Sequence, residues 1–325
     1  MDYIVFDLEW NQCPYGKERE NNKLPFEIIE IGAIKLNGQM ETVDQFQCLI
    51  QPVVYKRLHH RTQEIIGLDM KMLEQGTPFY KAVREFLKWC GEDYRFCTWG
   101  TMDLGELQRN MKYYGLLALL PGPVKYYDVQ KLFSRSFEDG VSRKSLEYGV
   151  NHLHVEKLAD FHRALADARY TAEILKRVDG HVRDTYYSID CYQSPRKRSE
   201  EIHAVYEDYT KYISREFPSK EEAMGDREVV SSRCIYCNRR ARKKIRWFSI
   251  NSRNYYCLAR CPEHGLLKGK IRMRRNDNDN FYVVKTIKAV GEDGAKQIRE
   301  KQRMMRLRRR RKRAHEAMGE MKKGL

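Results

Sequence analysis

The sequence predicts an α/β protein: a mixed sheet flanked by helices, followed by a small β-rich module and a basic helical tail. Two observations predict this order. In the first 180 residues, segments rich in β-branched and aromatic residues alternate with segments of helical periodicity. In the last 95 residues, paired cysteine and histidine residues occur together with a large excess of positive charge.

The elements of the predicted sheet follow one another in a regular order. Strands are expected at residues 3–6, 26–36 and 46–50, and Asn37-Gly38 predicts a hairpin turn between the second and third. Apolar residues then recur at helical spacing from Phe79 to Cys90. The later elements are a strand at 95–99, a helix over 104–115, a strand at 125–129, a helix capped by Ser142 and a helix over 164–175.

Charge divides the chain into four expected segments: an α/β domain at 1–180, a polar helical connector at 181–230, a zinc-ribbon-like module at 231–290 and a basic helical tail at 291–325. The first contains 24 Lys and Arg against 26 Asp and Glu, whereas the third contains 16 against 3 and the fourth 13 against 5. Such a basic region predicts a polyanionic partner, most commonly nucleic acid. Contact with structured RNA or a ribosome through the C-terminus is one form of this prediction.

The sequence argues against a membrane or secreted protein. Its longest apolar run, residues 116–120, is far shorter than the ~18 residues of a spanning helix. No basic segment precedes an apolar stretch at the N-terminus, as it would in a secretory signal. Nine cysteines, an odd number, suit a reducing compartment better than a disulfide framework. We therefore expect a cytoplasmic protein.

Four acidic residues lie in or next to apolar segments, where burial of a carboxylate is energetically costly unless a cation accompanies it. Asp7 and Glu9 lie two residues apart in an apolar strand, so their side chains share one face. Asp103 follows another apolar strand, and Asp167 lies among small residues on a helix. Carboxylates in this setting favour Mg²⁺ or Mn²⁺. Two solvated acids on an edge strand are the alternative. His162, on the loop before the last helix, is a candidate general base.

Three segments together carry a resemblance to a known family: Phe6-Asp7-Leu8-Glu9, then Trp99-Gly100-Thr101-Met102-Asp103, then His162-Arg163-Ala164-Leu165-Ala166-Asp167-Ala168. Residues 26–33 also resemble that family's second strand. In residues 1–180 the sequence resembles the DEDDh 3′→5′ exonucleases, which have a ribonuclease H-like fold. The resemblance is greatest to the group that contains the ERI-type exoribonucleases and the sporulation-inhibitor-like exonucleases.

The resemblance implies a mechanism with two Mg²⁺ or Mn²⁺ ions held by Asp7, Glu9, Asp103 and Asp167, with His162 as general base. The implied product is a 5′-mononucleotide released from a 3′ end, and the ERI-type group favours RNA over DNA. Leu8 and Trp10 are implied substrate contacts. Trp10 replaces a threonine of many relatives, so it either stacks on the terminal nucleotide or packs under the insertion at 11–23.

Two ligand pairs predict a structural zinc site in the third segment. Cys234 and Cys237 form one pair, and Cys261 and His264 form the other, each with a gap of two residues. Cys257 is the alternative to Cys261. Lys and Arg residues surround these ligands, and aromatic residues are interleaved with them, a pattern typical of single-stranded nucleic-acid binding. The aromatic residues concerned are Trp247, Phe248, Tyr255 and Tyr256, and a role in the module's own core is their alternative.

Two other functions are compatible with these features. A nucleic-acid-binding regulatory protein could retain the exonuclease fold without turnover, although binding alone would not require the complete set of five active-site residues. A proofreading subunit of a polymerase is a third interpretation, which no polymerase-docking segment supports. Metal-dependent hydrolysis is therefore the function that the sequence favours.

Overall fold

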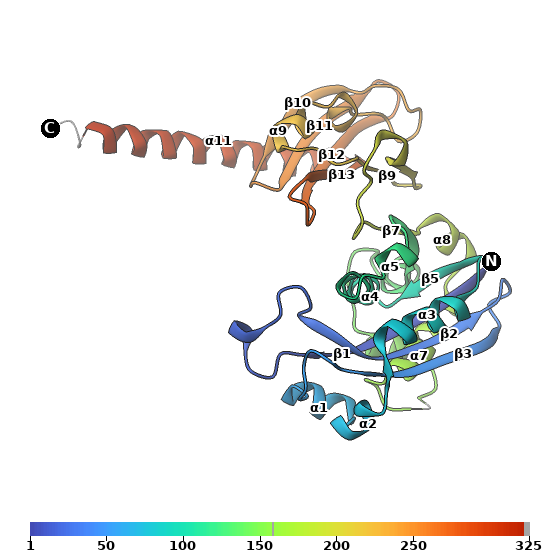
Figure 1. Ribbon diagram of the computed structural model, residues 1–325. Coiled ribbons are helices and arrows are strands. Elements are labelled where there is room, and N and C mark those ends of the chain that lie inside the picture. Colours follow the sequence, from blue (N-terminus) through green and yellow to red (C-terminus); the bar gives the residue numbers. More distant parts are fainter. Residues whose placement is uncertain (158, 322–325) are drawn as a thin grey trace. The chain divides into compact units, whose positions relative to one another are not determined.

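The computed structural model describes residues 1–157 and 159–321, with side chains described as far as Lys312. The chain forms two compact units, Met1–Tyr192 and Gln193–Leu325 (Figure 1). None of the described helices is both long enough and apolar enough to cross a membrane.

A seven-stranded mixed sheet forms the centre of the first unit, in the order β4-β3-β2-β1-β5-β6-β7. The strands β1, β2 and β3 pair antiparallel, whereas β5 pairs parallel with β1 and β6 pairs parallel with β5. The strands are β1 (Asp2–Gln12), β2 (Phe26–Leu36), β3 (Thr42–Gln51), β4 (Thr77–Pro78), β5 (Tyr94–Thr98), β6 (Val124–Asp128) and β7 (Ser188–Asp190).

Helices cover both faces of this sheet. The helices are α1 (His60–Ile66), α2 (Met70–Glu74), α3 (Phe79–Cys90), α4 (Met102–Tyr113), α5 (Val129–Phe137), α6 (Leu146–His152), α7 (Ala164–Arg177) and α8 (Gly180–Thr185), with short 3₁₀ turns η1 (Lys17–Arg19) and η2 (Leu117–Leu119). On β1, Ile4, Phe6 and Leu8 pack with α3 and α4 in the main core. Asp7 and Glu9 therefore project from the opposite face, where α7 crosses β1 and β2.

The second unit has an antiparallel sheet of six strands in the order β10-β11-β12-β13-β9-β8. Its elements are η3 (Arg198–Glu200), β8 (Ile202–Val205), β9 (Tyr209–Ile213), α9 (Lys220–Gly225), α10 (Arg227–Val230), β10 (Arg242–Ser249), β11 (Asn254–Cys261), β12 (Gly265–Arg275), β13 (Phe281–Val290) and α11 (Glu292–Met321). Residues of α9, α10 and the 234–241 loop pack on one face of the sheet. We call this the inner face. Ala295 and Ile298 of α11 pack on the other, outer face, beyond which α11 extends away from the sheet (Figure 1).

The predicted fold class is confirmed, but the expectation for residues 181–230 needs correction. Instead of a helical connector, this segment contributes β7 to the first sheet and β8 and β9 to the second. The physical reason is tertiary: β13 would otherwise be an open edge, and β9 covers it by pairing Ile213 with Val284. A smaller correction concerns α6, whose N-terminus is capped by Ser145 and not by Ser142.

Candidate active site and zinc centre

Strand β1 places two acids beyond the end of its parallel neighbour. The last β1–β5 pair is Val5 with Cys97, so Asp7 and Glu9 lie past it, on the face that α7 covers. Both side chains are half-buried. The sheet alternation that puts Phe6 and Leu8 into the core thus directs these two carboxylates to the other side.

Helix α7 brings a third acid to the same point because its backbone lies unusually close to β2. A Cβ atom on Gly32 would lie only 2.1 Å from the backbone nitrogen of Leu165, so only glycine fits there. Gly32 pairs with Asp7 across the β1–β2 ladder. Asp7, Glu9 and Asp167 consequently each present a carboxylate oxygen within 4.8 Å of the others.

One oxygen of Asp167 fits a metal ligand in particular. Asp167 Oδ1 is buried, and no hydrogen-bond partner for it exists among the residues that the structure describes. An unsatisfied buried carboxylate oxygen is costly unless a cation compensates it. Three converging carboxylates are also the oxygen-donor set that hard divalent ions prefer. The residues present therefore fit Mg²⁺ or Mn²⁺.

Asp103 reaches β1 from the opposite side of the sheet. It lies in the first turn of α4, and its Oδ1 accepts a hydrogen bond of 3.3 Å from the backbone N–H of Leu8. Leu8 lies between Asp7 and Glu9 in a part of β1 that has no pair in β5. The hydrogen bond therefore holds the fourth predicted acid next to the other three.

Burial and mutual repulsion raise the pKa of all four carboxyl groups. Burial raises the pKa of Asp7 well above its usual range, and the neighbouring carboxylates raise it further. For the same reasons the pKa of Glu9 is raised to about 8. Burial raises the pKa of Asp103 to about 7 and that of Asp167 to about 6, although backbone hydrogen bonds oppose both shifts. Four acids of this kind cannot all ionise without added positive charge.

His162 lies on the loop before α7, as predicted. Its side chain is exposed, its φ is +67°, and its backbone N–H donates to Asp167 Oδ2 at 3.2 Å. The hydrogen bond ties the loop to the acidic cluster while leaving the imidazole free to turn. This arrangement suits a side chain that exchanges protons at the rim of a site.

The sequence prediction missed the role of Glu30. This glutamate is fully buried, lies opposite Glu9 in the β1–β2 ladder and receives two hydrogen bonds from Arg163, at 3.0 and 3.1 Å. It also accepts from the backbone N–H of Ala164, the first residue of α7. The available signal was a single acid within the otherwise apolar run 28–34. The Glu30–Arg163 pair attaches the start of α7 to the sheet beside the candidate active site.

The two predicted substrate contacts on β1 have different surroundings from those expected. The Leu8 side chain is only 3% exposed and packs in the core, so only its backbone borders the acidic cluster. Trp10 is half-buried and packs against the ring of Phe26, with centroids 5.8 Å apart. This contact is with β2 and not with the insertion at 11–23, and stacking of Trp10 on the terminal nucleotide stays a prediction.

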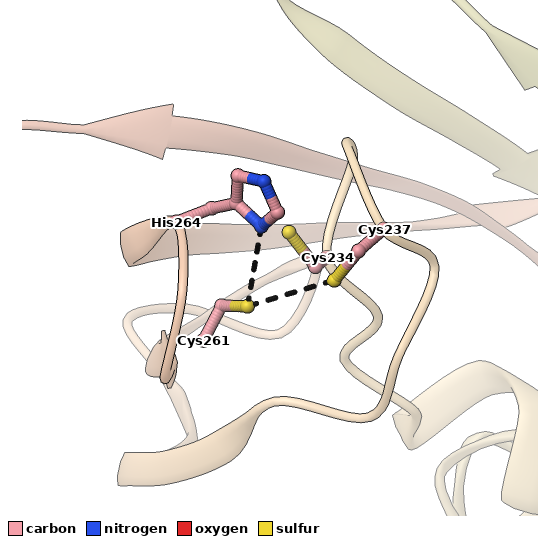
Figure 2. Close-up of side chains that lie close together, drawn as sticks. All are labelled: Cys234, Cys237, Cys261 and His264. Atoms are coloured by element: carbon pink, nitrogen blue, oxygen red, sulfur yellow. Dashed lines mark hydrogen bonds between the residues drawn. The ribbon is translucent and has the colours of Figure 1, made fainter.

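The second unit brings together the four predicted zinc ligands. Figure 2 shows Cys234, Cys237, Cys261 and His264 pointing toward one another, and their ligand atoms all lie within 4.8 Å. Cys237 Sγ and Cys261 Sγ are 3.7 Å apart, and Cys261 Sγ and His264 Nδ1 are 3.6 Å apart. Thiolates around a tetrahedral zinc ion, with Zn–S of about 2.3 Å, are about 3.8 Å from one another. The set therefore fits zinc.

Cys257, the alternative ligand, is absent from this group. It is fully buried, and its Sγ lies 3.6 Å from Ser232 Oγ. The interleaved aromatic residues are also accounted for by packing: Trp247 and Tyr255 contact the inner-face core, while Phe248 and Tyr256 pack under α11. All four residues thus contribute to packing, the alternative given for them. Only Tyr256 is buried, however, and stacking of bases on the half-buried rings of Trp247, Phe248 and Tyr255 stays a prediction.

Comparison with known proteins agrees with this site. Residues 4–175 match a family model described as an exonuclease. The DNA polymerase III PolC-type protein of Clostridium perfringens is 29% identical over 175 residues, and that of Thermotoga petrophila is 32% identical over 162. These stretches cover 54% and 46% of this chain but only 11% and 10% of those proteins.

Among solved structures, the nuclease domain of 3′hExo, a DEDDh family member bound to rAMP, is 19% identical with a TM-score of 0.49. The alignment covers 57% of this chain and 96% of that domain. The family match extends over more than half of the chain and includes Asp7, Glu9, Asp103, His162 and Asp167. The chain therefore belongs to the exonuclease family through residues 4–175 of its first unit.

Proposed function

We propose that the first unit is a 3′→5′ exonuclease that releases 5′-mononucleotides with two Mg²⁺ or Mn²⁺ ions. The observation that carries the proposal is the convergence of Asp7, Glu9 and Asp167 around a buried, unpaired carboxylate oxygen. These three acids would hold one ion, and Asp7 with Asp103 would hold the second. Bound there, the ions would supply positive charge to the scissile phosphate and lower the pKa of a bound water.

The remaining residues would accept a proton from the attacking water or hold α7 in position. His162, exposed on its loop, would accept the proton of the attacking water. The Glu30–Arg163 pair would keep α7, and with it Asp167, in place. Hydrolysis then needs no covalent intermediate on the protein.

The proposed substrate is the 3′ end of single-stranded nucleic acid, with RNA preferred. The resemblance of the three motif segments to the ERI-type exoribonucleases supports RNA. The curated relatives are named as DNA polymerases, which makes DNA the alternative substrate. Matched RNA and DNA oligomers of the same sequence, digested side by side at two salt concentrations, test this preference.

For the second unit we propose one structural zinc ion and a role in holding nucleic acid, including structured RNA. The four converging ligands support the zinc site. Burial raises the pKa of the Cys261 thiol, but hydrogen bonds from His264 outweigh this effect and lower it to about 6, which favours the thiolate that zinc requires. The excess of Lys and Arg in residues 231–325 supports the contact with nucleic acid.

The test of the exonuclease compares Asp7→Asn with Glu92→Gln. Both changes convert a carboxylate to an amide, but Glu92 is exposed and lies in the loop after α3, outside the active site. We expect Asp7→Asn to reduce hydrolysis of a labelled RNA by about 10³-fold or more, since metal ions contribute several kcal/mol to such reactions. Glu92→Gln should leave it unchanged. Tight binding without turnover under either metal would instead support the regulatory protein.

A further inference from the structure

The outer face of the second sheet carries a row of basic side chains along β12. Lys268, Lys270, Arg272 and Arg274 alternate with the buried residues Leu267, Gly269, Ile271 and Met273, so all four project from the same side. Neighbouring members of such a row are roughly 6.8 Å apart. This separation is similar to that between successive phosphates in an extended nucleic-acid strand.

Helix α11 adds a further cation to this row. The ammonium groups of Lys268, Lys270 and Lys301 surround the ring of Tyr256, at 5.9, 6.0 and 4.7 Å from its centroid. Tyr256 pairs with Lys270 between β11 and β12, and Lys301 reaches it from α11. The row on β12 and the helix therefore meet in one continuous basic surface.

These cations lack ion-pair partners. In the part of the chain that the structure describes, no acidic side chain pairs with Lys268, Lys270, Arg272 or Lys301. Lys288, directly opposite Lys268 on β13, differs because it pairs with Asp208 at 3.0 Å. Burial and the neighbouring cations lower the pKa of both Lys268 and Lys270. Such repulsion is costly in the free protein, and an external polyanion would relieve it.

Beyond the sheet, α11 carries a separate row of cations. Arg299, Arg303, Arg306 and Arg310 follow one another at helical spacing along one side of the helix, which is opposite to the side that carries Lys301. These arginines are therefore not part of the surface around Tyr256. The ring of Tyr256 itself is only 7% exposed, so it is too buried for a base to stack on it.

We propose that the β12 row and Lys301 form one surface that binds the phosphate backbone of nucleic acid without reading its bases. The inference rests on the proposed function only in taking nucleic acid as the substrate. Under this proposal, the affinity of the second unit for nucleic acid depends on charge and not on the base sequence. Recognition of the 3′ end is then left to the exonuclease site.

The first experiment measures binding of a fluorescent 20-nucleotide RNA to the full chain carrying Asp7→Asn, so that hydrolysis does not interfere. The test variant adds Lys268→Gln, Lys270→Gln and Arg272→Gln. The matched control instead adds Lys81→Gln, Arg84→Gln and Lys88→Gln, three exposed cations on α3 of the first unit. Zinc content and circular dichroism report whether both variants are folded.

We expect the test variant to bind on the order of 100-fold more weakly at 0.1 M salt, with a log–log salt slope reduced by about 2, because each lost phosphate contact on a single strand contributes about 0.7 to that slope. The control should bind within about threefold of the Asp7→Asn parent. A folded test variant that binds like the control would overturn the proposal. Hydrolysis by the unmodified protein is measured separately, so the failure of the exonuclease proposal would be recognised independently.

The second experiment separates backbone from base recognition. An RNA oligomer, a DNA oligomer and an abasic oligomer of equal length should bind within about threefold of one another. Loss of stacking would weaken the abasic ligand at least tenfold, because stacking contributes about 1–3 kcal/mol per base. That result would contradict the proposal, as would binding to phosphatidylserine vesicles tighter than to any of the three oligomers.

Discussion

The two units of this protein both concentrate like charges, but they do so with opposite signs and for opposite ligands. In the first unit, four carboxyl groups converge beside β1 and have raised pKa values. In the second, cations gather around Tyr256, and two of them, Lys268 and Lys270, have lowered pKa values. Each cluster is destabilised by its own repulsion.

The difference lies in how each cluster is built. The acids come from three elements that Gly32 and the Leu8 hydrogen bond hold within a few ångströms, which suits a small divalent ion. The cations are spread along a strand and a helix, which suits an extended polyanion. Compact and extended charge clusters thus indicate different partners. Four predictions test this comparison.

The largest expected effect comes from the candidate zinc ligands, because the proposed zinc ion would hold the loop that covers the inner face. Cys261→Ser should abolish zinc binding and unfold the second unit, since structural zinc contributes about 10–16 kcal/mol. Cys257→Ser is the matched control and should retain one zinc ion per chain. Elemental analysis and circular dichroism report both properties. A zinc ion retained by Cys261→Ser would show that the ligand set is wrong.

The next effect concerns the positioning of Asp167. Glu30→Gln removes the negative charge that pairs with Arg163 and one of its two acceptor oxygens, and a displaced α7 should reduce kcat about 10–100-fold, because small misplacements in active sites have effects of this size. Glu27→Gln is the control: Glu27 is also buried on β2, but it accepts from the backbone N–H groups of residues 53–55.

Glu27→Gln should lower the melting temperature with little change in kcat, whereas Glu30→Gln should change kcat with little change in KM. Steady-state kinetics together with thermal unfolding separate the two outcomes. Equal effects of both variants on kcat would mean that Glu30 contributes stability alone and does not position α7.

The pH dependence of stability gives a smaller effect. Protein without added divalent ions should lose stability as pH rises from about 4 to about 8. Glu9, Asp103 and Asp167 have folded-state pKa values of about 8, 7 and 6, so in this pH range the folded state binds more protons than the unfolded state. Stability therefore falls as pH rises. Thermal unfolding across this pH range, with and without Mg²⁺, measures the effect. An unchanged stability without Mg²⁺ would contradict it.

The smallest effect is a gain in stability from removing one acid. Without divalent ions, Asp7→Asn should raise the unfolding free energy by about 1–2 kcal/mol at pH 8, a shift of roughly 2–4 °C per kcal/mol for a domain of this size. With Mg²⁺ the unmodified protein should be the more stable of the two, because the ions stabilise only the protein that binds them. Differential scanning calorimetry with and without Mg²⁺ distinguishes these two outcomes. An Asp7→Asn variant that is less stable than the unmodified protein in both conditions would contradict the claim that repulsion destabilises the acidic cluster.

Much of the first unit could be predicted because local patterns agree with the final structure. Strand β2 and helix α3 have the predicted bounds, since an apolar run and a helical stripe each define one element. The five candidate active-site residues could be found from their order and from the spacing of His162 and Asp167. The His264-Gly265 ending favoured Cys261 over Cys257 without excluding Cys257, and the structure groups Cys261 with the other three ligands.

The remaining features depend on contacts between distant segments. Strand β9 forms in a polar segment because it pairs with β13, about 70 residues later in the chain, and β8 in turn pairs with β9. The role of Glu30 depends on Arg163, 133 residues away. The aromatic residues near the candidate zinc ligands have the composition of a base-stacking surface, and only the packing of α11 and the inner face shows that Tyr256 is buried and the other three are half-buried.

The central claim is that the acidic cluster removes nucleotides one at a time from a 3′ end. Its most direct test follows one RNA oligomer labelled at its 5′ end and another labelled at its 3′ end, both incubated with the protein and Mg²⁺ or Mn²⁺. We expect the 3′ label to appear at once as a 5′-mononucleotide, while the 5′-labelled strand shortens in single-nucleotide steps. Release of the 5′ label first, internal fragments without mononucleotides, or no turnover would contradict the claim.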